Sequence, residues 1–245
     1  MSTTTVTQAI TLRTRHIQDE ILEAGIDEAG RGCFWGPLTA GAVILPAEAD
    51  WSDKMRTLAP KLRDSKKLSP KRRAEYATAI KELAIAWGVG MVMAADLDAH
   101  GVTWANQTAF ERAAADLQTK PGRLLIDGTL PCKYEGGEVC TIIDGDATYL
   151  SIAAASILAK EAHDDWVRDF CAKDPTTAER FGFATNKGYG TAKHRAALKE
   201  HNPHEEHRQR FIYGGGASSG GYKRRAADSC QIMISEEEER GALQM

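Results

Sequence analysis

Four carboxylates occupy positions where an α/β sheet gathers its ligands. Asp27 and Glu28 are adjacent inside the apolar segment of residues 25–32, Asp127 ends the run RLLID, and Asp146 stands just ahead of an alanine-rich segment. Burying two neighbouring carboxylates is costly unless a cation or a proton neutralises them. Four convergent carboxylates without Cys or His favour a Mg²⁺ or Mn²⁺ site, and two such ions about 4 Å apart suit phosphoryl transfer.

Each of these acids also has a purely structural explanation. Asp127 precedes Gly128 in a common turn pair, and Asp146 is suited to cap a helix. Asp27 and Glu28 are harder to explain in this way, because successive strand residues point to opposite faces of a sheet. If helices cover both faces, at most one of the two side chains can face solvent freely. The spacing therefore favours a metal site and leaves structural roles open for single acids.

The segments around the acids alternate between strand and helix patterns. Apolar runs predict strands over residues 25–32, 37–46, 87–93, 123–127 and 139–143. Apolar residues at helical spacing predict helices from Ser69, over 103–117 and over 151–170. This alternation is typical of an α/β fold with at least one parallel crossover.

The chain of 245 residues is long enough for one large domain with a small appendage. Composition shifts along the chain divide it into four segments. We expect a flexible N-terminal extension over 1–20, an α/β domain over 21–175, a helical extension over 176–213, and a disordered Gly/Ser-rich and acidic tail over 214–245. We expect a monomer.

The composition, 42% hydrophobic and 27% charged, is that of an ordinary globular protein rather than a fibrous, disordered or membrane protein. No run approaches the roughly 18 apolar residues of a spanning helix, and the start lacks the apolar core of a secretory signal. The five cysteines include no CxxC pair, so we expect a cytoplasmic protein. With a net charge of −3, affinity for nucleic acid must come from a local patch, and residues 61–73 carry seven Lys/Arg against one acid. A solvated helix start is the alternative explanation of that run.

Six blocks of sequence, in this order, resemble ribonuclease HII, the type 2 ribonuclease H family: GIDEAGRG, DSKKLS, LLIDGT, GDATYLSIAAASILAK, KGYGTAKH and HRQRF. The resemblance implies a ribonuclease H-like fold, with a mixed central sheet flanked by helices and a small C-terminal helical extension. It also implies an endonuclease that hydrolyses the RNA strand of RNA/DNA hybrids and incises duplex DNA 5′ to embedded ribonucleotides. Two-metal catalysis with Mg²⁺ or Mn²⁺ would leave 5′-phosphate and 3′-hydroxyl ends.

The resemblance also implies roles for individual residues. The catalytic, metal-binding acids of the family correspond to Asp27, Glu28, Asp127 and Asp146. The element that contacts the 2′-hydroxyl at the RNA to DNA junction corresponds to Gly30, Arg31 and Gly32, and the tyrosine that stacks on the following deoxyribose corresponds to Tyr189. Telling RNA from DNA at one site depends on that hydroxyl, so these residues are expected to set specificity.

Basic and hydroxyl side chains are expected to meet the phosphates. The family's phosphate-contacting segment corresponds to Ser65, Lys66 and Lys67, which would position the backbone without reading sequence. Ser156 and Lys160 lie four residues apart on one predicted helix face, and either contact a phosphate or pack within the protein.

Several positions depart from the family pattern. Cys33 replaces a usual Pro, and its thiol either makes the activity sensitive to oxidation or is a tolerated small residue. Asp144 stands where the family often has Lys, but the spacing to the alanine-rich helix favours Asp146 as the ligand, and Asn186 replaces a common His. The histidines of residues 201–207 resemble a zinc set, yet a proline interrupts them and no cysteine joins them, so no metal is expected there.

Two other functions remain possible from the sequence. Another nuclease of the ribonuclease H-like fold, such as a transposase or junction resolvase, would share the acids but has no need for the GRG and KGY segments. A non-catalytic module that binds hybrids would tolerate the loss of an acid, and none is lost. In the tail, QIMIS at 231–235 faintly resembles a sliding-clamp-binding peptide but lacks its aromatic end.

Overall fold

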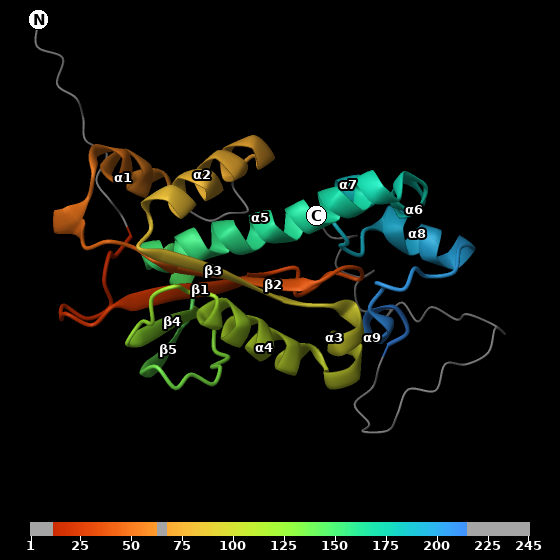
Figure 1. Ribbon diagram of the computed structural model, residues 1–245. Coiled ribbons are helices and arrows are strands. Elements are labelled where there is room, and N and C mark those ends of the chain that lie inside the picture. The colour runs from red at the N-terminus through yellow and green to blue at the C-terminus, as the bar shows by residue number, and fades with distance from the viewer. Residues whose placement is uncertain (1–11, 63–67, 215–245) are drawn as a thin grey trace, which may run out of the picture.

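The computed structural model describes residues 12–62 and 68–214. A five-stranded mixed sheet in the order β3-β2-β1-β4-β5 forms its centre (Figure 1). The strands are β1 (Glu23–Ala29), β2 (Leu38–Ile44), β3 (Ala86–Val92), β4 (Arg123–Asp127) and β5 (Glu138–Ile142). β1 pairs antiparallel with β2, and β2 with β3, whereas β1–β4 and β4–β5 are parallel. The expected mixed sheet with a parallel crossover is therefore confirmed.

Helices cover both faces of the sheet (Figure 1). The long α5 (Leu150–Lys173) packs on one face against β1 and β2, and α4 (Val102–Ala115) packs on the other face against β2 and β3. Small residues allow this close approach. A Cβ atom on Gly25 would lie 2.2 Å from the carbonyl carbon of Ser151 in α5, and one on Gly90 would lie 2.1 Å from the carbonyl oxygen of Ala109 in α4.

Three further helices, α1 (Asp53–Leu58), α2 (Pro70–Leu83) and α3 (Ala94–His100), complete the part of the described chain around the sheet. α1 and α2 pack together, with α2 against α5, and α3 precedes α4. The α2 start is as predicted, because the hydroxyl of Ser69 accepts a hydrogen bond from the N–H of Arg72 and Pro70 occupies the first turn. α1 and α3 were not predicted from the sequence.

The C-terminal helices gather at the far end of α5 (Figure 1). They are α6 (Pro175–Phe181), α7 (Phe183–Asn186), α8 (Ala192–Glu200) and α9 (Gln209–Ile212). Their apolar side chains pack around the fully buried Trp35, whose ring stacks on Phe183 with the centroids 3.7 Å apart. Since Trp35 lies just after β1, this packing attaches the C-terminal helices to the end of the sheet that carries Asp27.

The N-terminal residues that the structure describes contact the sheet. Arg13 forms a β-bridge with Tyr149, and the buried Arg123 of β4 pairs with Asp19 and Glu23. The four predicted segment boundaries stay predictions. Among the described residues, no helix combines the length and the apolar character needed to cross a bilayer.

Candidate active site

The sheet brings three of the four acids to the same end of neighbouring strands. Asp27 and Glu28 are near the end of β1, and Asp127 is the last residue of β4. The parallel pairing places Ile26 opposite Ile126. The next residue on each strand is an acid, so Asp27 and Asp127 lie beside each other. This is the carboxyl edge at which α/β sheets bind ligands.

Asp27 is the most enclosed of the acids. Its side chain is buried, and its Oδ1 accepts a hydrogen bond of 2.7 Å from the backbone N–H of Glu28. Ser156 of α5 also bonds to the Asp27 carboxylate. Burial, with the negative charges of Glu28 and Asp127, raises the pKa of Asp27 well above its usual range. The three acids therefore interact electrostatically across the strand ends.

Asp146 is linked to these acids through a turn. The Oδ1 of Asp127 accepts a hydrogen bond of 2.7 Å from the backbone N–H of Gly145, which begins the 3₁₀ turn Gly145–Ala147. Asp146, inside this turn, is half-buried, whereas Asp144 is exposed and has a left-handed backbone with φ of 52°. The turn and the burial favour Asp146 over Asp144 as the fourth member of the acid set.

The chemistry of this set fits a hard divalent cation. Within the described residues, no three His, Cys, Asp or Glu side chains are already arranged to hold a metal ion. The ligand atoms that this acid set offers are nevertheless carboxylate oxygens, which Mg²⁺ and Mn²⁺ prefer. A cation would also relieve the repulsion from Glu28 and Asp127 that raises the pKa of Asp27.

The loop after β1 presents its backbone beside the acids. Gly30 has φ of +75°, and a Cβ atom there would lie 2.6 Å from the ring of the buried His163 and 2.9 Å from the carbonyl oxygen of Pro37. At Gly32 a Cβ atom would meet no described atom within 4 Å. Arg31 between them is exposed and lies 3.8 Å from the Glu28 carboxylate. Of the two glycines, Gly32 is the one that leaves room for a substrate.

Tyr189 lies against the same loop although it is distant in sequence. A β-bridge joins it to Cys33, and Tyr189 as a whole residue is 38% exposed, so part of it is accessible to a ligand. The Lys160 ammonium lies 5.6 Å from the centre of the ring, and pairs with Asp164 at 2.6 Å. The GRG loop and Tyr189, the two elements that are expected to contact the sugar, therefore lie next to each other at one edge of the acid site.

The expected phosphate contacts are placed only in part. Ser65, Lys66 and Lys67 lie outside the described residues. Ser156 and Lys160 belong to the described helix α5 and are half or fully buried, with partners inside the protein. Their contact with a phosphate stays a prediction.

Comparison with known proteins identifies the family. The ribonuclease HII family model matches residues 24–213, which is more than half of the chain. The chain belongs to the ribonuclease HII family. Its activity is that of this family: a metal-dependent endonuclease that cleaves RNA in RNA/DNA hybrids and at embedded ribonucleotides.

Relatives from distant bacteria agree with this assignment. The chain is 42% identical to ribonuclease HII from Bacteroides fragilis over 80% of its own length and 91% of that protein, and 41% identical to the Prochlorococcus marinus enzyme over 77% and 95%. Its fold matches the structure of ribonuclease H2 from Pyrococcus horikoshii with a TM-score of 0.62 and 25% identity, covering 76% of this chain and 92% of that one. A Bst ribonuclease HIII solved with Mn²⁺, 18% identical and with a TM-score of 0.54, shares the fold.

The structure explains two departures from the ribonuclease HII pattern. Cys33 is fully buried, 3.6 Å from the His163 ring, and burial raises the pKa of its thiol to about 11. The thiol is therefore protonated at neutral pH and a weak nucleophile. Asn186 donates to the carbonyl of Phe181 at 2.7 Å and accepts from the N–H of Gly188 at 2.8 Å, so it shapes the turn that carries the predicted sugar-stacking tyrosine.

Two buried histidines support this turn from behind. The Nε2 atoms of His194 and His207 are 3.0 Å apart, and the Nδ1 of His194 lies 3.0 Å from the Tyr189 carbonyl. Burial, with the neighbouring His194, lowers the pKa of His207 to about 3. Among the described residues, His201 and His204 do not join them in a group that could hold a metal ion.

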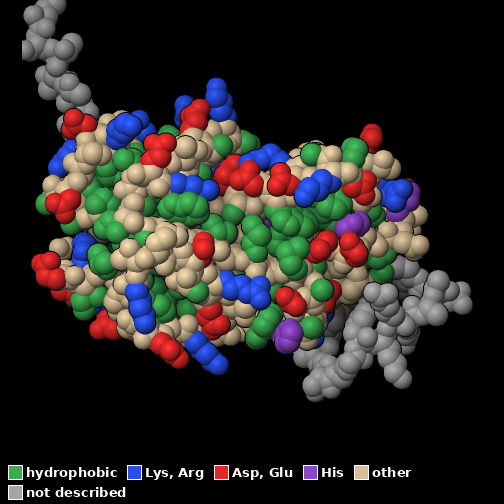
Figure 2. Space-filling view, viewed as in Figure 1, with side chains coloured by type: hydrophobic (Ala, Val, Ile, Leu, Met, Phe, Trp, Pro, Cys, Tyr) green, Lys and Arg blue, Asp and Glu red, His purple; other side chains and the backbone are tan. Residues whose placement is uncertain are grey.

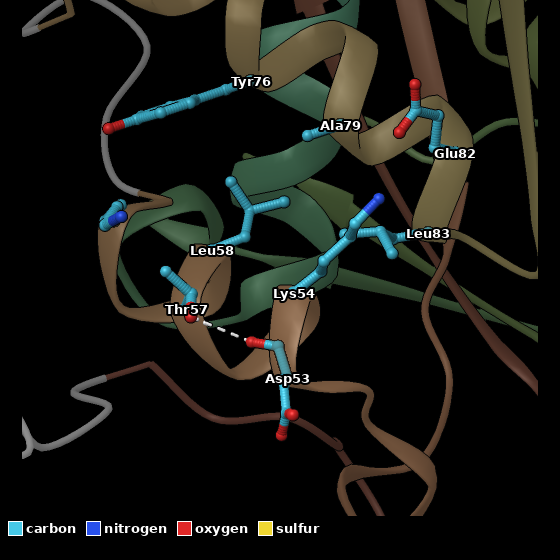
Figure 3. A pocket seen from close by; sticks show the side chains of 9 residues that line it. Asp53, Lys54, Thr57, Leu58, Tyr76, Ala79, Glu82 and Leu83 are labelled. Atoms are coloured by element: carbon cyan, nitrogen blue, oxygen red, sulfur yellow. Dashed lines mark hydrogen bonds between the residues drawn. The ribbon is translucent and has the colours of Figure 1, made fainter.

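A separate groove lies between α1 and α2 (Figure 3). It has a volume of about 430 Å³, and its apolar lining includes Leu58, Tyr76, Ala79 and Leu83. None of the described residues assigned to the reaction lines it.

The surface charges are mixed rather than separated. Figure 2 shows acidic and basic side chains interspersed over one face, as the small net charge suggests.

Proposed function

We propose that this enzyme cleaves on the 5′ side of a ribonucleotide and leaves 5′-phosphate and 3′-hydroxyl ends. Two divalent cations, Mg²⁺ or Mn²⁺, would be held by Asp27, Glu28, Asp127 and Asp146. Bound there, such a pair supplies an activated water and charge stabilisation for the leaving oxygen. The observation that carries the proposal is the electrostatic coupling of Asp27 with Glu28 and Asp127 at strand ends next to an open backbone loop.

The protein's own residues hold the acids in place. Ser156 and the N–H of Glu28 bond to the Asp27 carboxylate, and the N–H of Gly145 bonds to Asp127. These donors favour the ionised carboxylates and fix their orientation. Such preorganisation would keep the acids ready for cations without a rearrangement at the moment of reaction.

In this proposal the loop Gly30, Arg31 and Gly32 contacts the 2′-hydroxyl, and Tyr189 stacks on the following sugar. Support comes from the open space at Gly32 and from the partly exposed Tyr189 beside it. Ser65, Lys66 and Lys67 would contact phosphates, with Lys160 and Ser156 near the scissile bond. We further propose that the enzyme acts in the cytoplasm as a monomer.

The acid assignment is tested by Asp27→Asn with Asp144→Asn as the matched control. Asp27→Asn should abolish cleavage of an RNA/DNA hybrid while hybrid binding stays measurable by fluorescence anisotropy. Asp144→Asn removes a nearby but exposed charge and should keep substantial activity. Full activity of Asp27→Asn, or loss of activity only in Asp144→Asn, would overturn the assignment.

The substrate assignment is tested with a DNA duplex that carries one ribonucleotide and with a long RNA/DNA hybrid. Incision of the first duplex on the 5′ side of the ribonucleotide is expected with Mg²⁺ or Mn²⁺. Cleavage of the hybrid alone would point to a type 1-like activity and would contradict the role given to the GRG loop.

A sliding clamp is a further candidate partner. A ribonuclease HII from Archaeoglobus fulgidus, 28% identical over 74% of this chain and 88% of that one, was solved in a PCNA complex, with a TM-score of 0.56. The segment at 231–235 lies outside the described residues. A pull-down with a purified clamp, using the full chain and a chain ending at residue 213, tests this interaction, and equal capture of both would exclude the tail.

A further inference from the structure

Arg208 is a fully buried cation whose hydrogen bonds go to backbone carbonyls of one loop. Its Nη1 donates to the carbonyl of Arg31 at 2.9 Å, and its Nε donates to the carbonyl of Gly36 at 3.0 Å. Its own backbone N–H donates to the carbonyl of Phe34 at 2.8 Å. One residue from the C-terminal extension thus ties together the start, middle and end of the segment that follows β1.

We infer that Arg208 is a positioning residue that orients the ribose-reading loop for the 2′-hydroxyl. The inference rests on the proposed role of that loop. In a planar trans peptide the C=O and the N–H point in opposite directions. Because Arg208 holds the Arg31 carbonyl on its own side, the N–H of the same peptide, which belongs to Gly32, points away from Arg208, at a residue whose side-chain position is open.

The charge of Arg208 also strengthens this donor. A guanidinium bonded to a carbonyl polarises the peptide, so that the opposite N–H becomes a better hydrogen-bond donor. The Nη2 of Arg208 is buried and has no hydrogen-bond partner within the described structure. A polar group in that condition is unfavourable for folding alone, and a hydrophobic side chain would avoid the penalty. Retaining a cation here is explained by what it does to the loop.

The chain offers a matched control in Arg123, another arginine that is buried in the described structure. Arg123 bonds to the carboxylates of Asp19, Glu23 and Glu138 at the opposite end of β4 from Asp127. Removing its charge should lower stability without touching the loop. The comparison therefore separates a buried arginine that stabilises the fold from one that orients a recognition loop.

The experiment measures affinity by fluorescence anisotropy in EDTA, at a temperature where each variant is folded by circular dichroism. Two duplexes of one sequence are compared, one all DNA and one with a single ribonucleotide, and the readout is the ratio of their Kd values. Arg208→Met should reduce this ratio by about tenfold, or abolish the preference if it is smaller than tenfold, because the hydrogen bond from the Gly32 N–H to the 2′-hydroxyl is lost. Affinity for the all-DNA duplex should not change, because phosphate contacts dominate it.

Arg208→Lys should retain part of the preference, because an ammonium can reach one of the two carbonyls and keeps the charge. This variant keeps the test decisive if the Met variant does not fold. Arg123→Met should lower the melting temperature and leave the ratio unchanged.

The outcomes distinguish this inference from the proposed function beneath it. If Gly32→Ala lowers the preference and Arg208→Met does not, the positioning role is wrong and ribose reading by the loop stands. If neither variant changes the preference, or if the unsubstituted protein has no preference, then both the positioning role of Arg208 and the recognition of the ribose by the loop are wrong. A drop in the ratio for Arg123→Met equal to that for Arg208→Met would show that the effect is structural and would overturn the inference.

Discussion

The two glycines of the GRG loop should respond to the same substitution in opposite ways. Gly30→Ala places a methyl group 2.6 Å from the His163 ring and 2.9 Å from a backbone carbonyl, at a φ of +75°. The ring cannot move aside easily, because His163 is fully buried between Cys33 and Asp164. Gly32→Ala places its methyl group in open space, at a backbone conformation that is not left-handed.

The expected magnitudes follow from these distances. A left-handed backbone costs alanine about 1–2 kcal/mol, and overpacking a buried site adds about 1–3 kcal/mol, so Gly30→Ala should lose about 2–5 kcal/mol. For a protein of this size that corresponds to a decrease in melting temperature of about 4–20 °C. Gly32→Ala should stay within about 0.5 kcal/mol of the unsubstituted protein, as most exposed substitutions do.

The effect on activity should instead be seen at Gly32, where the substitution leaves stability almost unchanged. If a sugar approaches the Gly32 backbone, the methyl group blocks its hydrogen bond, and kcat/KM for a duplex with one ribonucleotide should fall at least about tenfold. Thermal unfolding by circular dichroism and a gel assay of nicking measure the two effects on the same samples. A fully active Gly32→Ala variant would show that substrate does not approach this backbone, and an unaltered melting temperature for Gly30→Ala would refute the steric argument.

Three further predictions concern charge and turn geometry. Burial and the neighbouring acids raise the pKa of Asp27, so its contribution to stability is present below the unfolded pKa and is lost as the pH rises through the folded value. In EDTA, Asp27→Asn should therefore melt higher than the unsubstituted protein at pH 7.5, and acidification toward pH 4 should remove that difference; a lower melting temperature at pH 7.5 would contradict the electrostatic account. The pKa of His207 is lowered to about 3, so stability should be full above about pH 6.5 and decline by about 1.4 kcal/mol per pH unit below it. Urea titrations should show this decline reduced in His207→Gln and unchanged in the exposed His201→Gln control. Asn186→Ala leaves a carbonyl and an N–H without their partners and should cost about 1–3 kcal/mol while lowering nicking activity, whereas equal activity would show that the turn forms without it.

Much of the sheet could be predicted because its signals are local. Asp127 ends a short apolar run, and Ser69 with Pro70 marks a helix start, so the strand end and the helix start appear in the sequence itself. α3 was missed because it is short and begins at Met93 without a side-chain cap. α1 did carry a signal, since the hydroxyl of Ser52 accepts from the N–H of Met55, but six residues are too few for a helical period to stand out.

In the candidate site, too, the features with local sequence signals could be predicted, whereas those that depend on distant contacts could not. The acids could be proposed from residue type and position, whereas the difference between Gly30 and Gly32 depends on His163, 130 or more residues away in the chain. The role of Arg208 depends likewise on carbonyls far from it in sequence. Contacts of this kind leave no periodic or compositional trace, so the sequence could suggest which loop reads the sugar but not what holds that loop in place.

One face of α5 supports both halves of the proposed reaction. Ser156 bonds to Asp27, Lys160 lies over the Tyr189 ring, and His163 packs beneath Gly30. Their spacing of four and then three residues places them along one side of a helix. The distance between the acids and the sugar-reading elements is then set by the rise of a single rigid helix rather than by flexible loops. A ribonucleotide held by the loop and Tyr189 would thus place a neighbouring phosphate at a fixed distance from the acids, which ties the choice of bond to the identity of the sugar.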